Sequence, residues 1–299
     1  MTRYFCKSCG THMVLLNDGK WWASTGVLDR VEGVVKVAGH IYVGDTKDGG
    51  LSEWLLKLDQ DQPLKRWEQS AGKSKALPEN HWPASKMAAS KNEQKQLEVR
   101  CHCGGVHFHI IPAVKKSLNE ISPSASDGEK LTWLLRAVLG KYACGVCVCS
   151  SCRLASGFDI NAWCYVPKID LFATDGGKLD ISNAGTLTKY HSSESKDRYF
   201  CGTCGATVFY EAHGRPDIIE PSIGLLRTES GARADDWLEY RYWEVSHADD
   251  AANKALIAYL LRGMKEFAKK TGKDNPAQMI ADLKRRAHMA QAKMGEAAS

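Results

Sequence analysis

The stretch VCVCSSCRLASG, residues 146–157, places Cys147, Cys149 and Cys152 close together, and Cys144 lies three positions before the first of them. A zinc ion held by three protein thiolates keeps a position for water or substrate, whereas a fourth protein ligand closes the site. The spacing alone allows both arrangements. Whether this cluster is catalytic or structural therefore depends on the rest of the chain.

The composition is ordinary for a globular protein, with 43% hydrophobic and 25% charged residues in a chain of 299. Eleven cysteines are many for this length, and most fall in Cys-x-Cys or Cys-x-x-Cys pairs, which favours metal binding over a disulfide framework. The first residues lack a basic region followed by an apolar run, and no stretch of about 18 apolar residues occurs. We therefore expect a soluble cytoplasmic protein that makes no membrane contact.

The net charge of +5 is mild and gives no strong argument for nucleic acid as a partner. Basic residues near the C-terminus are more simply explained as the solvated face of a helix. These residues are Lys269, Lys270, Lys284, Arg285 and Arg286.

Two segments of the chain are alike: RYFCKSCGTHMVL from Arg3 and RYFCGTCGATVFY from Arg198. Each is followed by a second similar stretch, GVLDR at Gly26 and GLLRT at Gly224. This is an internal repeat. The first copy begins with its Cys-x-x-Cys pair, so it corresponds to the C-terminal half of a unit, whereas the second copy closes a complete one.

Cys6 and Cys9 of the first copy keep a metal-binding spacing but have no visible partners in their own half-unit. Two ligands do not make a zinc site. The pair binds zinc with Cys144 or with another chain, for example in a homo-oligomer that completes the half-unit, or it is a relic.

The pattern divides the chain into a partial unit over residues 1–59, a linker over 60–96, a complete zinc domain over 97–246 and C-terminal helices over 247–299. The linker is rich in Lys, Gln, Ser, Ala and Pro. Short runs of aromatic and β-branched residues predict a mainly β core. Helices are expected after Ser126, after Asn275, and on an apolar stripe formed by Leu256, Leu260, Met264 and Phe267.

Two cysteine pairs predict a structural zinc. Cys101 and Cys103 lie two apart at the start of a strand, so their sulfurs point to one face. Cys201 and Cys204 form a turn, with Gly205 where the chain needs a positive φ. Together the pairs supply four thiolates, which would clamp the beginning of the domain to its end.

Three motifs in order, CHCGGVHF, CVCSSCRLASG and RYFCGTCGA, resemble those of the glutathione-dependent formaldehyde-activating enzyme (GFA) and centromere protein V (CENP-V) family. The resemblance covers roughly residues 99–245, with a half-unit at the N-terminus. It implies a mainly β, zinc-binding β-tent (Mss4-like) fold, here with added C-terminal α-helices. One departure is Val148, which stands where the family commonly has histidine.

The resemblance also implies two zinc ions in the complete domain, one structural and one catalytic. The structural ligands would be Cys101, Cys103, Cys201 and Cys204. The catalytic ligands would be Cys147, Cys149 and Cys152, which favours the open site over the closed one.

The activity that the resemblance implies is that of a carbon–sulfur lyase or thiol-adduct synthase, similar to S-(hydroxymethyl)glutathione synthase. Glutathione or another small thiol would bind as a thiolate and attack a small aldehyde. Three thiolate ligands make zinc a weak Lewis acid, which agrees with thiol-adduct chemistry and disfavours hydrolysis. Arg153 is a candidate for a bidentate contact with a glutathione carboxylate, and Ser156 and Gly157 are candidates for close approach of the substrate backbone.

The alternative is a non-catalytic zinc-binding module for protein or chromatin contact. A fourth zinc ligand from Cys144 would favour that alternative, because it would leave no position for substrate.

Overall fold

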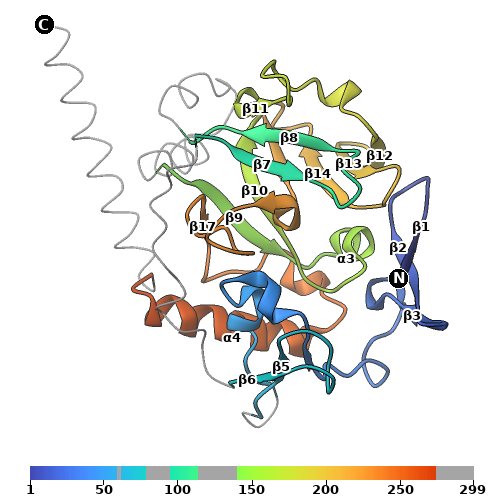
Figure 1. The fold of residues 1–299 in the computed structure, drawn as a ribbon, viewed down its shortest axis with the longest axis vertical. Coiled ribbons are helices and arrows are strands. Elements are labelled where there is room, and N and C mark those ends of the chain that lie inside the picture. The colour runs from blue at the N-terminus through green and yellow to red at the C-terminus, as the bar shows by residue number, and fades with distance from the viewer. Residues whose placement is uncertain (59–61, 79–94, 114–139, 274–299) are drawn as a thin grey trace, which may run out of the picture.

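A computed structural model describes residues 1–58, 62–78, 95–113 and 140–273 of the chain. Over these residues the fold is mainly β, with four sheets and the two α-helices α3 (Ser150–Ser156) and α4 (Lys254–Lys270). The expected mainly β architecture with a C-terminal helix is therefore confirmed (Figure 1). The helices expected after Ser126 and after Asn275 lie outside the described residues.

The largest sheet has seven strands and carries the cysteines of the middle and last motifs. Its pairs are antiparallel, except that β17 runs parallel to β9. In spatial order its strands are β12 (Leu187–Ser193), β13 (Lys196–Cys201), β14 (Thr207–Ala212), β15 (Ile218–Pro221), β10 (Asn161–Pro167), β9 (Tyr142–Cys147) and β17 (Leu238–Tyr240).

A four-stranded sheet packs against one end of the large sheet, as Figure 1 shows for β7 and β8 in front of β13 and β14. Phe108 and Phe209 join the two layers, with ring centroids 5.1 Å apart. This packing brings the Cys-x-Cys motif that follows β7 to the end of β13. In spatial order the strands are β11 (Leu171–Phe172), β8 (His107–Ile110), β7 (Leu97–Arg100) and β16 (Leu226–Arg227).

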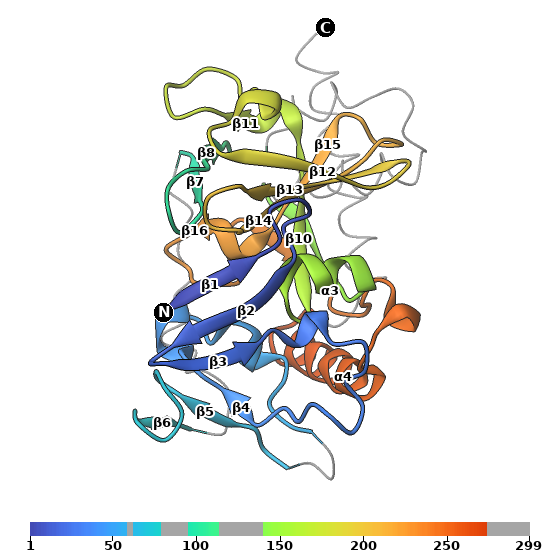
Figure 2. The ribbon, with the colours of Figure 1, turned by 90° about the vertical axis from the view of Figure 1, so that its right-hand side faces the viewer.

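The first copy of the repeat forms a separate three-stranded sheet. Its strands are β1 (Thr2–Phe5), β2 (His12–Asn17) and β3 (Lys20–Ala23), in that spatial order. Figure 2 shows this sheet beside α3, and both β2 and the 3-10 turn that follows β3 contact that helix. The N-terminal segment therefore lies against the same part of the fold that holds the middle cysteine motif.

Part of the stretch expected to be a linker is folded. β5 (Lys65–Trp67) and β6 (Ala76–Leu77) pair with β4 (Gly39–His40) in a small sheet. Leu64 is buried in the main core, and Arg66 forms a buried ion pair with Glu53 at 2.6 Å. The low-complexity composition of residues 60–96 does not predict these contacts, because they depend on one apolar side chain and one paired charge.

Residues 43–55 and α4 share the main core with the end of the large sheet. The Trp54 ring lies edge-on to Tyr240, with centroids 4.8 Å apart, and also contacts Phe267 of α4. The predicted apolar stripe of this helix is buried, which confirms that prediction; its members are Leu256, Leu260, Met264 and Phe267. Residues from the N-terminal third of the chain thus complete the core of the large domain.

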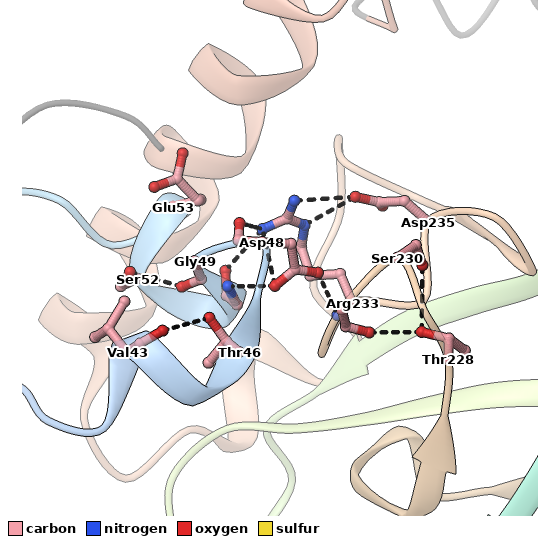
Figure 3. A network of polar contacts seen from close by, with 12 residues as sticks. Val43, Thr46, Asp48, Gly49, Ser52, Glu53, Thr228, Ser230, Arg233 and Asp235 are labelled. Atoms are coloured by element: carbon pink, nitrogen blue, oxygen red, sulfur yellow. Dashed lines mark hydrogen bonds and ion pairs between the residues drawn. The ribbon is translucent and has the colours of Figure 1, made fainter. Parts of the chain in front are cut away.

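A buried polar network connects residues 43–53 to the loop before β17 (Figure 3). Asp48 accepts hydrogen bonds from the backbone N–H groups of Gly50 and Arg233, each at 2.8 Å. The Arg233 guanidinium donates to the Asp48 carbonyl at 2.6 Å and pairs with Asp235 at 3.0 Å. Because both Asp48 and Arg233 are 2% exposed, each depends on the other to satisfy its polar atoms.

Candidate functional site

Four cysteines meet where β7 and β13 end. The sulfurs of Cys101, Cys103, Cys201 and Cys204 all lie within 4.8 Å of one another. Cys103 Sγ is 3.5 Å from both Cys101 Sγ and Cys201 Sγ. Zinc–sulfur bonds of about 2.3 Å in a tetrahedron require sulfurs roughly 3.8 Å apart, so this set fits zinc without rearrangement of the chain.

Backbone N–H groups point at these sulfurs, as is expected for thiolate ligands. Val106 N lies 3.3 Å from Cys101 Sγ, and Gly105 N lies 3.4 Å from Cys103 Sγ. Burial opposes ionisation of Cys201, but hydrogen bonds from the Thr186 hydroxyl and the turn backbone lower the pKa of its thiol to about 6. The surroundings of Cys201 therefore favour the charged form that binds a metal, whereas burial raises the pKa of the Cys103 and Cys204 thiols.

The middle motif brings three sulfurs together by a strand-to-helix turn. Cys147 is the last residue of β9, Cys149 caps the N-terminus of α3, and Cys152 lies in the first turn of that helix. Cys147 Sγ is 3.7 Å from Cys149 Sγ and 3.5 Å from Cys152 Sγ. These separations also suit zinc, and the soft thiolate donors match that metal.

Donors again surround the cluster. Cys152 Sγ accepts from Trp163 Nε1 at 3.4 Å and from the Arg198 guanidinium at 3.5 Å, and Cys149 Sγ accepts from the backbone N–H of Cys152 at 3.4 Å. Hydrogen bonds from the neighbouring thiols lower the pKa of Cys149, while the hydrogen bond with Cys149 raises the pKa of Cys147. Among the three thiols, Cys149 therefore ionises most readily.

Cys144 is not part of this group. It lies on β9 three residues before Cys147, so the two side chains point to opposite faces of the strand. Cys144 is fully buried in the main core, and the metal-ligand group around Cys147 comprises three cysteines among the described residues. The geometry therefore provides three sulfurs rather than four.

The three sulfurs line a cavity of about 130 Å³ at the surface. The other residues of its wall come from β9, β10, β13, β14, β15, the loop between β14 and β15 and the loop after β17; they are Gly145, Trp163, Tyr165, Arg198, Tyr210, Arg215, Glu220, Ser246 and His247. The cluster thus has one side open to a small molecule and the other closed by protein.

Arg153, Ser156 and Gly157 do not line this cavity, although the sequence predicts substrate contacts for them. Arg153 donates to the carbonyl of Leu28 at 2.8 Å, and the Gly157 carbonyl accepts from Gly26 N at 2.9 Å. Ser156 Oγ donates to the Cys152 carbonyl within α3. Helix α3 turns these residues away from the sulfurs and toward the N-terminal sheet, so their contacts are structural.

Arg198 is the residue of the site that the sequence analysis missed. It is buried, its guanidinium carbon lies 5.1 Å from the Tyr210 ring centroid, and its Nε and second terminal nitrogen have no hydrogen-bond partner among the described residues. A buried guanidinium with unused donors beside a cavity is a ready site for an anion. The sequence carries no clear signal for this role, because Arg198 follows Lys196 and Asp197 in the same strand and the equivalent Arg3 of the first copy is exposed.

The far wall of the cavity is also charged. Arg215 pairs with Glu220, and burial raises the pKa of that carboxyl group. Behind them Arg241 donates to the Tyr165 hydroxyl at 2.9 Å. The cavity therefore presents more basic than acidic groups to an incoming molecule.

Comparison with known proteins agrees with the middle and last motifs. Residues 139–240 match the family described as glutathione-dependent formaldehyde-activating enzyme. The family resemblance is thus confirmed for this part of the chain. The match to the GFA family includes the three-sulfur cluster and the metal-binding turn, or knuckle, of Cys201 and Cys204. It includes neither Cys101 and Cys103 nor the N-terminal half-unit.

A curated relative of the chain is an uncharacterized lyase of Schizosaccharomyces pombe, 29% identical over 76 residues, which are 25% of this chain and 48% of that protein. The chain therefore spans about half the length of the curated relative it matches. A crystal structure of a Rhodobacter sphaeroides protein aligns with 48% of this chain and 98% of that chain at 17% identity, with a TM-score of 0.28, too low to support an argument.

None of the helices in the described part of the chain combines the length and apolarity that a membrane span requires.

Proposed function

We propose that this protein is a zinc-dependent carbon–sulfur lyase of the GFA type, which joins a thiol such as glutathione to a small aldehyde and catalyses the reverse cleavage. The observation that carries the proposal is the group of Cys147, Cys149 and Cys152 at the wall of a cavity, with Cys144 turned into the core. The family match and the lyase name of the relative support the same class of reaction.

In this proposal Cys147, Cys149 and Cys152 hold the catalytic zinc. Bound by three thiolates with a position left over, zinc would stabilise a substrate thiolate relative to its thiol. The cavity of about 130 Å³ receives only the reacting end of a molecule as large as glutathione, so the remainder of the substrate lies across the rim.

Arg198 positions the reacting sulfur and balances charge. Its guanidinium donates to Cys152 Sγ, has two further nitrogens without a partner among the described residues, and belongs to a residue of the cavity wall. During addition the substrate sulfur forms a bond to the carbonyl carbon, the carbonyl π bond breaks, and the proton lost by the thiol ends on the new hydroxyl. A fixed cation beside the sulfurs stabilises the substrate thiolate and the alkoxide that addition produces, without reorganisation.

The structural part of the proposal assigns a second zinc to Cys101, Cys103, Cys201 and Cys204. This ion would fix β7 against the end of β13 and so hold the strand that carries Arg198. We further propose that the complete zinc domain spans residues 97–246 and that the protein works in a reducing compartment such as the cytoplasm. All eleven cysteines are free thiols, which supports the latter.

The test is exchange NMR of glutathione with formaldehyde in the presence of zinc-loaded protein. Since the adduct also forms spontaneously, the rate with protein is compared with the rate in buffer. We expect acceleration by the wild type and by Cys144→Ser, and none by Cys149→Ser. If no protein accelerates exchange although metal analysis finds two zinc ions per chain, the enzyme assignment fails, and the binding-module alternative takes its place.

A further inference from the structure

The two copies of the repeat fold in the same way, down to individual hydrogen bonds. Arg3 pairs with Leu15 as Arg198 pairs with Tyr210, and both ladders slip at the following phenylalanine. Ser24 N donates to Met13 O at 2.8 Å, and the equivalent bond from Ser222 N to Val208 O is 2.9 Å. Residues 2–27 therefore have the backbone of residues 197–225, the second half of the complete domain.

The half site for a metal is preformed in the first copy. Cys6 N donates to Thr11 O at 2.9 Å, and Gly10 N donates to Cys6 O at 2.8 Å, as in the knuckle of the second copy. Hydrogen bonds from the backbone of Cys9 and Ser8 lower the pKa of the Cys6 thiol. Both cysteines are partly exposed, and the described residues bring no third ligand to them.

The apolar face of the first copy is exposed where that of the second copy is covered. Tyr4 is 40% exposed and its counterpart Tyr199 is 6% exposed. For Trp21 and its counterpart Ile219 the exposed fractions are 63% and 0%.

In the second copy the sheet of β7 and β8 covers this face, and the loop between those two strands supplies the Cys-x-Cys sulfurs. Among the described residues the first copy has neither cover nor sulfurs. A single hairpin of this kind would therefore both cover the open face and complete the ligand set.

The two copies also meet across an approximate two-fold relation. A Cβ atom at Gly10 would lie 2.6 Å from the Phe200 ring, and one at Gly205 would lie 2.5 Å from the Phe5 ring. The two phenylalanine rings pack edge to face with centroids 6.1 Å apart. Each knuckle therefore seats the phenylalanine of the other.

The two-fold relation also identifies a second surface, beside Gly224, that lacks, among the described residues, the helix packed at the equivalent place. Gly26 of the first copy packs against α3, where a Cβ would lie 2.5 Å from Gly157. Its counterpart Gly224 is exposed, faces open space, and lines a groove of about 430 Å³. The groove lies where the two-fold relation would place a second α3.

We propose that residues 2–27 are a docking surface and half of a zinc site for a partner polypeptide that carries the first half of another such unit. The partner supplies a β-hairpin with a Cys-x-Cys motif, which covers Tyr4 and Trp21 and completes four thiolates with Cys6 and Cys9. The partner's counterpart of α3, the helix at the partner's own Cys-x-Cys-x-x-Cys motif, occupies the groove beside Gly224. This inference does not rest on the proposed enzymatic function.

The test uses the full chain, loaded with zinc, and a synthetic peptide of residues 97–110 as a stand-in for the hairpin. Metal analysis after gel filtration is expected to find two zinc ions per chain alone and three with peptide. Cobalt substitution should add the absorption of a further four-thiolate site. Cys6→Ser in the chain, or serine at both cysteines of the peptide, is expected to abolish the third equivalent.

A second variant separates docking from metal binding. Trp21→Ser alters an exposed side chain, so it should leave the two resident zinc ions in place and weaken peptide binding at least about tenfold. The proposal is overturned if saturating peptide adds no zinc. It is also overturned if zinc alone produces a Cys6-dependent dimer, because two copies would then pool their half sites and leave no place for a partner hairpin.

Discussion

Replacement of Gly263 by alanine tests how closely α4 packs on residues 50–55. Gly263 lies in the interior of this helix, where it approaches the backbone of Trp54. A Cβ at this position would lie 2.0 Å from the Trp54 carbonyl oxygen, whereas ordinary van der Waals contact begins at 3.4 Å. The obstacle is backbone, so it cannot rotate away, and either the helix or residues 50–55 must shift by more than an ångström.

Helix propensity and overpacking have opposite effects on the free energy of unfolding of the Gly263→Ala variant. Alanine in place of glycine within a helix stabilises it by about 1 kcal/mol, whereas overpacking a well-filled contact costs about 1–3 kcal/mol and occasionally more. Because the clash is with main chain, we expect the upper part of that range and a net loss of about 2 kcal/mol in the free energy of unfolding. At an m-value of roughly 3 kcal/mol/M the urea midpoint should fall by about 0.7 M.

The assay is urea unfolding followed by circular dichroism, with Ala258→Gly as the matched control. Ala258 is exposed in the interior of the same helix, so its replacement removes propensity alone, about 1 kcal/mol. The reasoning is refuted if Gly263→Ala raises the midpoint by as much as Ala258→Gly lowers it, since propensity would then be the only term.

Four further predictions concern the metal sites and the buried network. Cys101→Ser should lower the melting temperature more than Cys149→Ser, because the four-sulfur cluster joins distant parts of the chain; equal shifts in a thermal scan would contradict this. Cys144→Ser should retain two zinc ions by metal analysis, and loss of one would return Cys144 to the ligand set. Arg198→Lys should keep both ions but reduce kcat/KM for adduct formation about tenfold to a hundredfold, since the charge-assisted contact is worth roughly 1.5–3 kcal/mol; unchanged kinetics would remove Arg198 from the site. Asp48→Ala should destabilise the protein by about 3 kcal/mol in urea, because the buried N–H groups of Gly50 and Arg233 lose their acceptor, and a loss below about 1 kcal/mol would show that water replaces the carboxylate.

Local rules were sufficient for the features that depend on one element at a time. The apolar stripe of α4 follows from helical periodicity, and its members are buried as expected. The four-sulfur group could also be anticipated, because each pair is brought together locally by a tight turn; the expectation that Cys101 and Cys103 lie on a strand was wrong, since both lie in the turn between β7 and β8. Only the meeting of the two pairs required the fold.

Features that depend on how elements meet could not be predicted. Arg153 is adjacent to a site cysteine in sequence, but α3 directs its side chain to Leu28. Arg198 is 46 positions from Cys152, and antiparallel pairing through β14, β15 and β10 brings it to the sulfur. Sequence neighbours of a ligand are therefore poor guides to substrate contacts when a helix begins at the motif.

The question raised by Cys144 shows what a spacing leaves undetermined. Cys144 and Cys147 have the same Cys-x-x-Cys separation as the two knuckles, yet they lie on a strand, which sends their sulfurs to opposite faces. Each knuckle instead has a glycine directly after its second cysteine, Gly10 and Gly205, with φ of +77° and +75°. Val148 stands at the corresponding place after Cys147, and a β-branched residue strongly resists that backbone conformation. The residue after the pair, rather than the spacing, thus distinguishes Cys144 and Cys147 from the two glycine-containing turns, whereas Cys149 and Cys152 are brought together by the first turn of α3.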